Sequence, residues 1–184
     1  MIPVNRAKEE AMAAETTTEA GSVPVYRSEG DGDAIWAMGA LMELKLTAAE
    51  TGGEVGALLV TQPPGVATPL HVHHGEAEVA YILQGTMTYR AGEDIFHLEP
   101  GGMLFLPKAT PHAFRITGTS ACRWLGFVLP GGLEGLYAEV GRPAVQRTMP
   151  EFTGVPDPEE IARWNEVGPG YGVQVVGPPL APDA

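Results

Sequence analysis

Short apolar runs separated by glycine and proline fill most of the chain between residues 34 and 130. The 184 residues include 24 glycines and 17 prolines, which interrupt regular structure often enough to keep each run short. We predict about ten strands spaced roughly 8–12 residues apart, a pattern typical of an all-β sandwich or barrel. The predicted strands are 34–39, 40–46, 54–62, the segment around His71, 78–84, 87–91, 95–98, 103–107, 112–117 and 122–129.

The first part of the chain differs from this strand-rich centre. Residues 1–22 are polar and rich in alanine and threonine, and they show no strand periodicity. A short helix over residues 8–15 and the lack of any fixed structure are both compatible with this composition. We therefore expect an N-terminal polar arm at 1–22, followed by a barrel at 23–130.

The last part of the chain predicts helices. One helix is expected over 133–141, and a second over 157–168, with Asp157 as its N-cap and Pro158 at its first position. Ile161 and Trp164 would dock this second helix on the barrel wall. The final run, 173–180, predicts an extended strap. Residues 131–184 thus predict C-terminal helices and an extended tail packed on the barrel.

Three histidines and one glutamate stand at spacings that bring side chains together. His71 and His73 are two apart in a predicted strand, so their side chains point to the same face. Glu78 begins the next strand, and His112 begins a later one. Imidazole suits divalent transition metals such as iron, nickel, copper and zinc. We predict that His71, His73, Glu78 and His112 bind one divalent transition metal per chain.

At these positions the sequence resembles the cupin superfamily. The first cupin motif is matched in full and the second in part, over about residues 55–130. In the second motif, Ala109 and Ile116 replace a glycine and an asparagine, which are not ligand positions. The matching residues are Gly65, His71, His73, Glu78, Gly85, Gly101, Pro107 and His112. The resemblance implies a cupin barrel, the double-stranded β-helix or jelly-roll, with a metal held by the four residues named above.

A narrower resemblance is to the quercetin 2,3-dioxygenase-like monocupins. It rests on the HVHH…E core, the upstream segment 34–53 and the tail 171–180. This likeness implies a dioxygenase that cleaves a flavonol or a similar enolisable aromatic substrate with O2 and releases carbon monoxide. Nickel, iron, manganese and cobalt are all compatible with the ligand set, and zinc is possible. Glu78 is expected to act as a ligand, as the catalytic base, or as both in turn.

Several aromatic and methionine side chains are candidates for contact with the substrate. Phe114 is the strongest, because it lies two residues from His112 and so shares its face. His74 should point away from the metal ligands, and His97 should be an exposed strand residue. The substrate-binding candidates are Phe114, Tyr81, Met87, Phe105 and Trp36, with Tyr89, Trp124 and Met38 as further pocket or mouth residues.

Composition restricts the partners. The net charge of −12 argues against nucleic acid and anionic membrane surfaces. Cys122 is the only cysteine, which excludes an internal disulfide, and its apolar setting predicts a buried core residue. The sequence begins without a signal peptide, so a cytoplasmic location is expected. A small-molecule substrate, O2 and a homodimer formed through barrel edges and the N-terminal segment complete the prediction.

Two other functions are compatible with the same ligands. A non-oxidative metal enzyme, such as an isomerase, lyase or polyketide cyclase, would use the ion to polarise a carbonyl. A cupin without catalytic activity would only bind a metal or a small molecule. The ligand set serves the two catalytic functions equally well, because fold and ligands do not fix the reaction.

Overall fold

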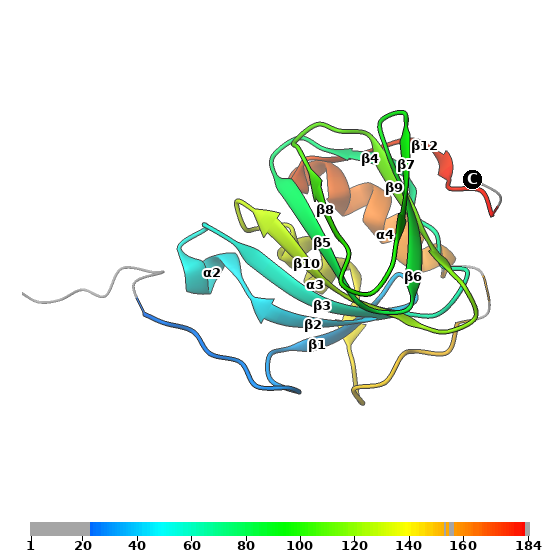
Figure 1. Cartoon of the computed structure of the whole chain (residues 1–184). Helices are drawn as coiled ribbons and strands as arrows, with labels where there is room; N and C mark the ends of the chain where they lie inside the picture. Colours follow the sequence, from blue (N-terminus) through cyan, green and yellow to red (C-terminus); the bar gives the residue numbers. More distant parts are fainter. Residues whose placement is uncertain (1–22, 153, 155–156, 183–184) are drawn as a thin grey trace, which may run out of the picture.

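The computed structural model describes residues 23–152, 154 and 157–182. Two antiparallel sheets face each other across the core (Figure 1). The larger sheet has the strand order β11 (Arg142–Pro143), β1 (Ala34–Ala37), β2 (Ala40–Leu46), β3 (Gly56–Gln62), β10 (Cys122–Leu129), β5 (Ala77–Gln84) and β8 (Met103–Leu106). The smaller sheet has the order β12 (Val173–Pro179), β4 (Pro69–His73), β9 (His112–Thr117), β6 (Thr86–Ala91) and β7 (Asp94–Leu98).

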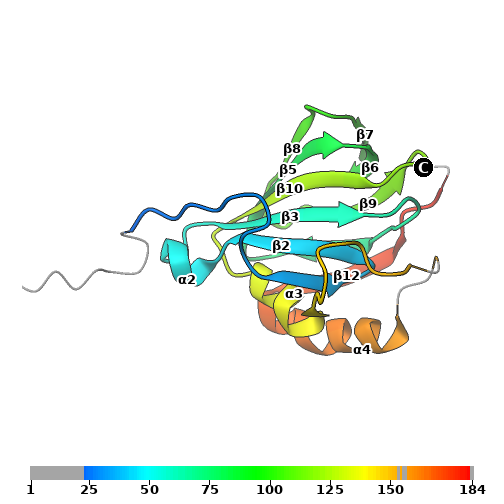
Figure 2. The same ribbon diagram turned by 90° about the horizontal axis from the view of Figure 1, so that it is seen from below.

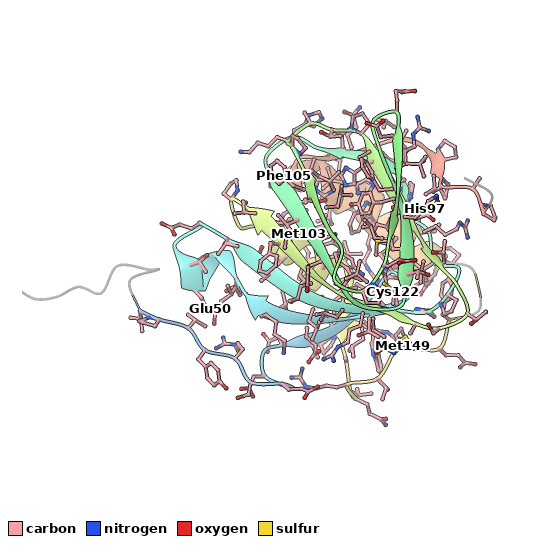
Figure 3. All side chains as sticks on the ribbon, viewed as in Figure 1. Glu50, His97, Met103, Phe105, Cys122 and Met149 are labelled. Atoms are coloured by element: carbon pink, nitrogen blue, oxygen red, sulfur yellow. The ribbon has the colours of Figure 1, made fainter. Side chains whose placement is uncertain are left out.

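Strand alternation separates the core from the surface. On β8, Leu104 and Leu106 are buried, whereas Met103 and Phe105 project outward and are 65% and 59% exposed (Figure 3). Because successive side chains of a strand point to opposite faces, the inward set of each sheet forms a continuous apolar layer. Cys122 is fully buried in this layer, as predicted. The all-β fold expected from the sequence is confirmed.

The C-terminal segment covers one side of the barrel. Figure 2 shows α3 (Glu134–Val140) and α4 (Pro158–Val167) side by side near β1 and β12. Asp157 caps α4 as predicted, because its carboxylate accepts a hydrogen bond from the Glu159 N–H at 3.0 Å. A short 3-10 helix, η1 (Gly168–Tyr171), leads from α4 into β12.

Three features differ from the expectations. The predicted strap is the strand β12, which pairs with β4 and so belongs to the smaller sheet. The short helix α2 (Ala48–Thr51) and the two-residue strand β11 were not predicted, since both are too short to give a periodic pattern. The described part of the chain has twelve strands rather than about ten. The possible helix at 8–15 lies outside the described residues.

Two tight positions depend on backbone conformation. Gly85 has a φ of 76°, and a Cβ there would lie 2.5 Å from the carbonyl oxygen of Ala121, so only glycine fits without rearrangement. Ala109 has a φ of 60°, although it replaces the glycine of the second cupin motif. Its N–H donates to the carbonyl of His73 at 2.8 Å, so the turn is attached to a predicted ligand. The left-handed conformation of Ala109 is therefore a local strain next to the site.

Replacing Ala109 with glycine should relieve this strain. We expect Ala109→Gly to raise the free energy of unfolding by about 0.5–1 kcal/mol, since glycine adopts a positive φ without a Cβ clash. Urea denaturation of the metal-free protein measures the change. Ala162→Gly, in the exposed face of α4, is the matched control and should lower stability by about 1 kcal/mol. A destabilising effect of Ala109→Gly would contradict the strain.

Candidate metal centre

Three histidine rings meet between the two sheets. His71 and His73 lie on β4, and the register of β4 with β9 pairs His71 directly with His112. The ring centroids are 4.2 to 5.0 Å apart, and the potential ligand atoms all lie within 4.8 Å of one another. All three side chains are buried, with exposures of 9%, 2% and 3% for His71, His73 and His112. The strand pairing thus brings the predicted histidines together.

A hydrogen bond at Nδ1 orients each ring. The acceptors are the Pro69 carbonyl for His71 at 2.7 Å, a Glu76 carboxylate oxygen for His73 at 2.8 Å, and the Thr110 carbonyl for His112 at 2.9 Å. A carbonyl or an ionised carboxylate can only accept, so the proton lies on Nδ1 of each ring. Nε2 of His71 and of His73 is therefore left to bind another group, which is the usual arrangement of metal-binding histidines, and Nε2 of His112 faces the Glu78 carboxylate.

Glu78 reaches the cluster from the opposite sheet. Its Oε2 lies 3.2 Å from His112 Nε2, and its Oε1 lies 3.5 Å from His73 Nδ1. Burial alone would raise the pKa of Glu78, but the hydrogen bond from His112 and the charges of the three histidines lower it to about 2. The carboxylate is therefore ionised at neutral pH. The structure thus places Glu78, the fourth predicted ligand, beside the three-histidine cluster.

The charges of the cluster differ from ring to ring. Burial, with the neighbouring charges of His112 and His73, lowers the pKa of His71 to about 3. Burial acts in the same direction on His112, but its hydrogen bond to Glu78 and the charge of that carboxylate raise its pKa above the usual value. The ring of His71 is thus neutral at neutral pH, whereas the Glu78 carboxylate favours protonation of His112.

One buried atom of the site has no partner. His73 Nε2 is the only buried side-chain nitrogen or oxygen without a hydrogen bond in the described ranges. A buried polar atom without a partner costs about 1–3 kcal/mol. A divalent transition metal would satisfy this atom, and three imidazoles with a carboxylate are a suitable donor set for it. The residues present therefore fit the metal that the sequence predicts.

A cavity of about 610 Å³ opens beside the cluster. His71, Glu78 and His112 form part of its wall. The rest is mainly apolar and comes from both sheets and from the C-terminal helices. The apolar and aromatic lining includes Met38, Met42, Leu58, Val60, Val66, Tyr89, Leu106, Phe114, Trp124, Tyr137, Phe152, Ile161 and Trp164. Such a space suits a mostly apolar small molecule.

Of the five residues predicted to contact the substrate, only Phe114 lines this cavity. The expectations for the other four are corrected by the structure. Tyr81 and Phe105 each follow an inward residue by one position, so they face the outside of the larger sheet. Trp36 donates its indole N–H to the Thr148 carbonyl at 2.8 Å, away from the cavity. Met87 is fully buried within the core cluster.

Other histidines and pocket residues lie as expected. His74 is exposed and contacts Gln174 on β12, with 3.2 Å between His74 Nε2 and the amide oxygen. His97 is exposed on β7 (Figure 3). Met38, Tyr89 and Trp124, the further candidates, line the cavity. Ile161 and Trp164 also line it, rather than docking only on the barrel wall.

Two residues of the site were not predicted. Glu76 is 8% exposed and accepts a hydrogen bond from His73. In the sequence it could have been recognised as an acidic residue in the polar turn that follows the histidines. Tyr137 lies on α3, more than fifty residues from the first motif, and only the tertiary fold brings it to the cavity. A local sequence pattern could therefore have indicated Glu76 but not Tyr137.

Sheet order and histidine geometry define a class: a two-sheet β-barrel with a three-histidine centre. Residues 58–128 match the family model of the cupin domain. The chain is 27% identical over 123 residues to quercetin 2,3-dioxygenase from Bacillus subtilis (strain 168), which covers 67% of this chain. The chain spans only 36% of the length of that relative. Residues 58–128 are therefore similar to cupin domains, and the chain is similar to a quercetin 2,3-dioxygenase.

Solved structures support the same fold. A predicted oxalate decarboxylase from Thermotoga maritima has a TM-score of 0.53 and 21% identity, covering 58% of this chain and 99% of its own. KdgF from Halomonas sp. also has a TM-score of 0.53, with 14% identity, and covers 61% of this chain and 98% of its own. At these identities the likeness concerns the barrel alone. Within the described residues, every helix is too short or too polar to cross a membrane.

Removing the carboxylate behind His73 should weaken metal binding. We expect Glu76→Ala to lower the affinity for Co²⁺ or Ni²⁺ about 10- to 100-fold, because the ring of His73 loses its orienting acceptor. Glu76→Gln, which keeps an acceptor oxygen, should lose less. Isothermal titration calorimetry on the metal-free protein measures both. Glu99→Ala, in an exposed turn, is the control, and equal affinities in all four proteins would refute the role of Glu76.

Proposed function

We propose that this protein is a metal-dependent dioxygenase of the quercetinase-like type, acting on a flavonol or a similar enolisable aromatic compound with O2. The observation that carries the proposal is the junction of the histidine centre and the apolar cavity. His71 and His112 belong to both, so a molecule in the cavity lies next to the metal position. The similarity to a quercetin 2,3-dioxygenase supports the same reaction.

Nε2 of His71, His73 and His112 and the carboxylate of Glu78 would hold the ion. A divalent ion at this point supplies Lewis acidity toward an enolic hydroxyl, and a redox-capable ion also supplies reactivity toward O2. Nickel, iron, manganese and cobalt all suit these donors, and zinc binds similar ligands without redox chemistry.

The chain itself binds and orients the substrate. The cavity volume of about 610 Å³ exceeds that of a three-ring aromatic compound, and its walls offer aromatic surfaces on both sheets. Phe114 and Trp124 meet edge to face with 5.8 Å between centroids, and the indole N–H of Trp124 donates to Gln62 at 3.2 Å. These contacts fix Trp124, so that its ring presents a rigid surface. The apolar walls also exclude water from the reacting atoms.

Glu78 would receive the proton of the substrate. It is ionised, borders the cavity and adjoins His112, so an enolic hydroxyl bound there can transfer its proton to Oε1 or Oε2. The product of this transfer is an enolate, which is the electron-rich form that O2 attacks. Glu78 thus combines the roles of ligand and base.

The remaining expectations about organisation also belong to the proposal. Residues 23–130 would form the catalytic barrel, with 131–184 as its cover, and the expected arm at 1–22 lies outside the described residues. A homodimer would use the β8 edge of the larger sheet, where Met103 and Phe105 are exposed (Figure 3). The cytoplasmic location stays a prediction.

Dioxygen uptake tests the reaction. Protein reconstituted with nickel, iron, manganese or cobalt should consume O2 in step with the loss of quercetin and should release carbon monoxide. Zinc-loaded protein and His73→Ala should show no uptake, because zinc lacks redox chemistry and the variant lacks a ligand. An oxygen electrode and absorbance of the flavonol measure the two rates together. No uptake by a fully loaded centre would rule out the dioxygenase reaction on flavonols.

Metal dependence also separates the two alternatives. A non-oxidative enzyme would convert its substrate without O2 and would retain activity with zinc. A binding protein would convert nothing, yet its melting temperature would rise with its ligand.

A conservative change at Glu78 tests the base. Glu78→Gln should lower kcat for quercetin by about 100-fold or more, since general-base catalysis contributes on the order of 10²–10⁴. Metal content, measured by atomic absorption, is followed in the same samples to separate loss of the base from loss of the ion. Glu99→Gln is the matched exposed control. Normal turnover by metal-loaded Glu78→Gln would show that Glu78 is not the base.

A further inference from the structure

Two phenol groups from different parts of the chain border the cavity beside Glu78. Tyr89 comes from β6 and is only 4% exposed, and its ring stacks on that of His112 with 5.9 Å between centroids. Tyr137 comes from α3, and its ring packs against Trp164 at 5.5 Å. Both rings are therefore held in place by packing.

Neither hydroxyl has a hydrogen-bond partner among the described residues. Neither phenol oxygen is among the buried side-chain atoms that lack a partner in that part of the chain. Both residues line the same cavity, so we take their hydroxyls to face it. Two hydroxyl groups with no internal partner are thus available to a molecule bound there.

The charge of Glu78 reaches both groups. Burial, followed by the Glu78 carboxylate, raises the pKa of Tyr89 and of Tyr137 well above the usual value. The charge of Tyr137 further raises the pKa of Tyr89, and the charge of Glu76 further raises the pKa of Tyr137. Both phenols line the cavity that Glu78 also borders, and the ring of Tyr89 stacks on His112, whose Nε2 lies 3.2 Å from the Glu78 carboxylate. A protonated phenol can donate a hydrogen bond to an anion.

We propose that Tyr89 and Tyr137 form a pair of hydrogen-bond donors that binds an anionic oxygen of the substrate beside Glu78. This inference rests on the proposed function for the identity of the substrate. Donors fixed before the reaction, in a cavity from which water is excluded, stabilise developing negative charge more strongly than water does.

The pair specifies a class of substrate. When an enol loses its proton to Glu78, the O–H bond breaks and the carboxylate gains the proton, while the negative charge remains on the substrate. In an enol conjugated with a neighbouring carbonyl, that charge is shared by two oxygens. One oxygen takes the metal position and the other accepts from Tyr89 and Tyr137, which keep their protons. The preferred substrate is therefore a hydroxy-enone, and a simple phenol should bind less well.

Ligand binding without turnover tests the pair. Zinc-loaded protein is titrated with 3-hydroxyflavone in the absence of O2, and the absorbance of the ligand anion gives Kd. We expect Tyr89→Phe and Tyr137→Phe each to raise Kd about tenfold or more, as for lost hydrogen bonds to a charged group. The anion band should also weaken. Tyr81→Phe, on the outer face of β5, is the matched control and should leave Kd unchanged.

The outcomes distinguish this inference from the proposed function. Each variant loses one oxygen atom that has no internal partner, so the melting temperatures should stay near that of the wild type. Wild-type affinity in both Phe variants would overturn the donor pair while leaving the dioxygenase proposal intact. If the wild type binds 4-nitrocatechol but not 3-hydroxyflavone, both the flavonol and the preference for a hydroxy-enone are wrong. The affinities of the wild type and the two Phe variants for 4-nitrocatechol then test the donor pair. Binding of neither probe would overturn both.

Discussion

The site depends on the direction of three imidazole rings. A free imidazole can bind a metal through either nitrogen, but in this barrel each Nδ1 already donates to an acceptor of the chain. Two of these acceptors are the carbonyls of Pro69 and Thr110, each two residues before the histidine that it orients. Backbone carbonyls in the first residue of a strand, or just before it, are fixed by the fold itself. The orientation of His71 and His112 is therefore a local consequence of how β4 and β9 begin.

His73 needs a different solution, and that solution links the site to its surroundings. Its acceptor is the carboxylate of Glu76, which is itself buried. The backbone of His73 also accepts from Ala109, in the turn before β9. One histidine thus joins the turn after its own strand to the turn that leads to His112. A change in either turn would alter the distance between ligands, which explains why a strained residue such as Ala109 matters there.

The histidine cluster could be predicted from the sequence, whereas most of the pocket could not. Two-residue spacing places His71 and His73 on one face of a strand whatever the rest of the fold does. For the other strands, the alternation of side chains does not say which face is inward unless one residue is already known to face the core. Without such a residue, Tyr81 and Phe105 were as plausible as their neighbours Ala80 and Leu106, which are the buried residues. Tyr137 depends on how α3 folds back on the barrel, and no local pattern contains that information.

The features that are unfavourable in the metal-free centre are those that favour its proposed ligands. Three imidazoles are packed together out of water, and His73 Nε2 lacks a partner, so an ion that binds only the folded chain stabilises it by mass action. Three neutral imidazoles and one carboxylate leave a divalent ion with a net positive charge. In a cavity of low dielectric constant, this charge attracts an anion more strongly than it would in water. The unpartnered hydroxyls of Tyr89 and Tyr137 act in the same direction, because both present protons to the same space. The apolar walls therefore select an aromatic body, while the few polar groups select a molecule that becomes an anion at one end.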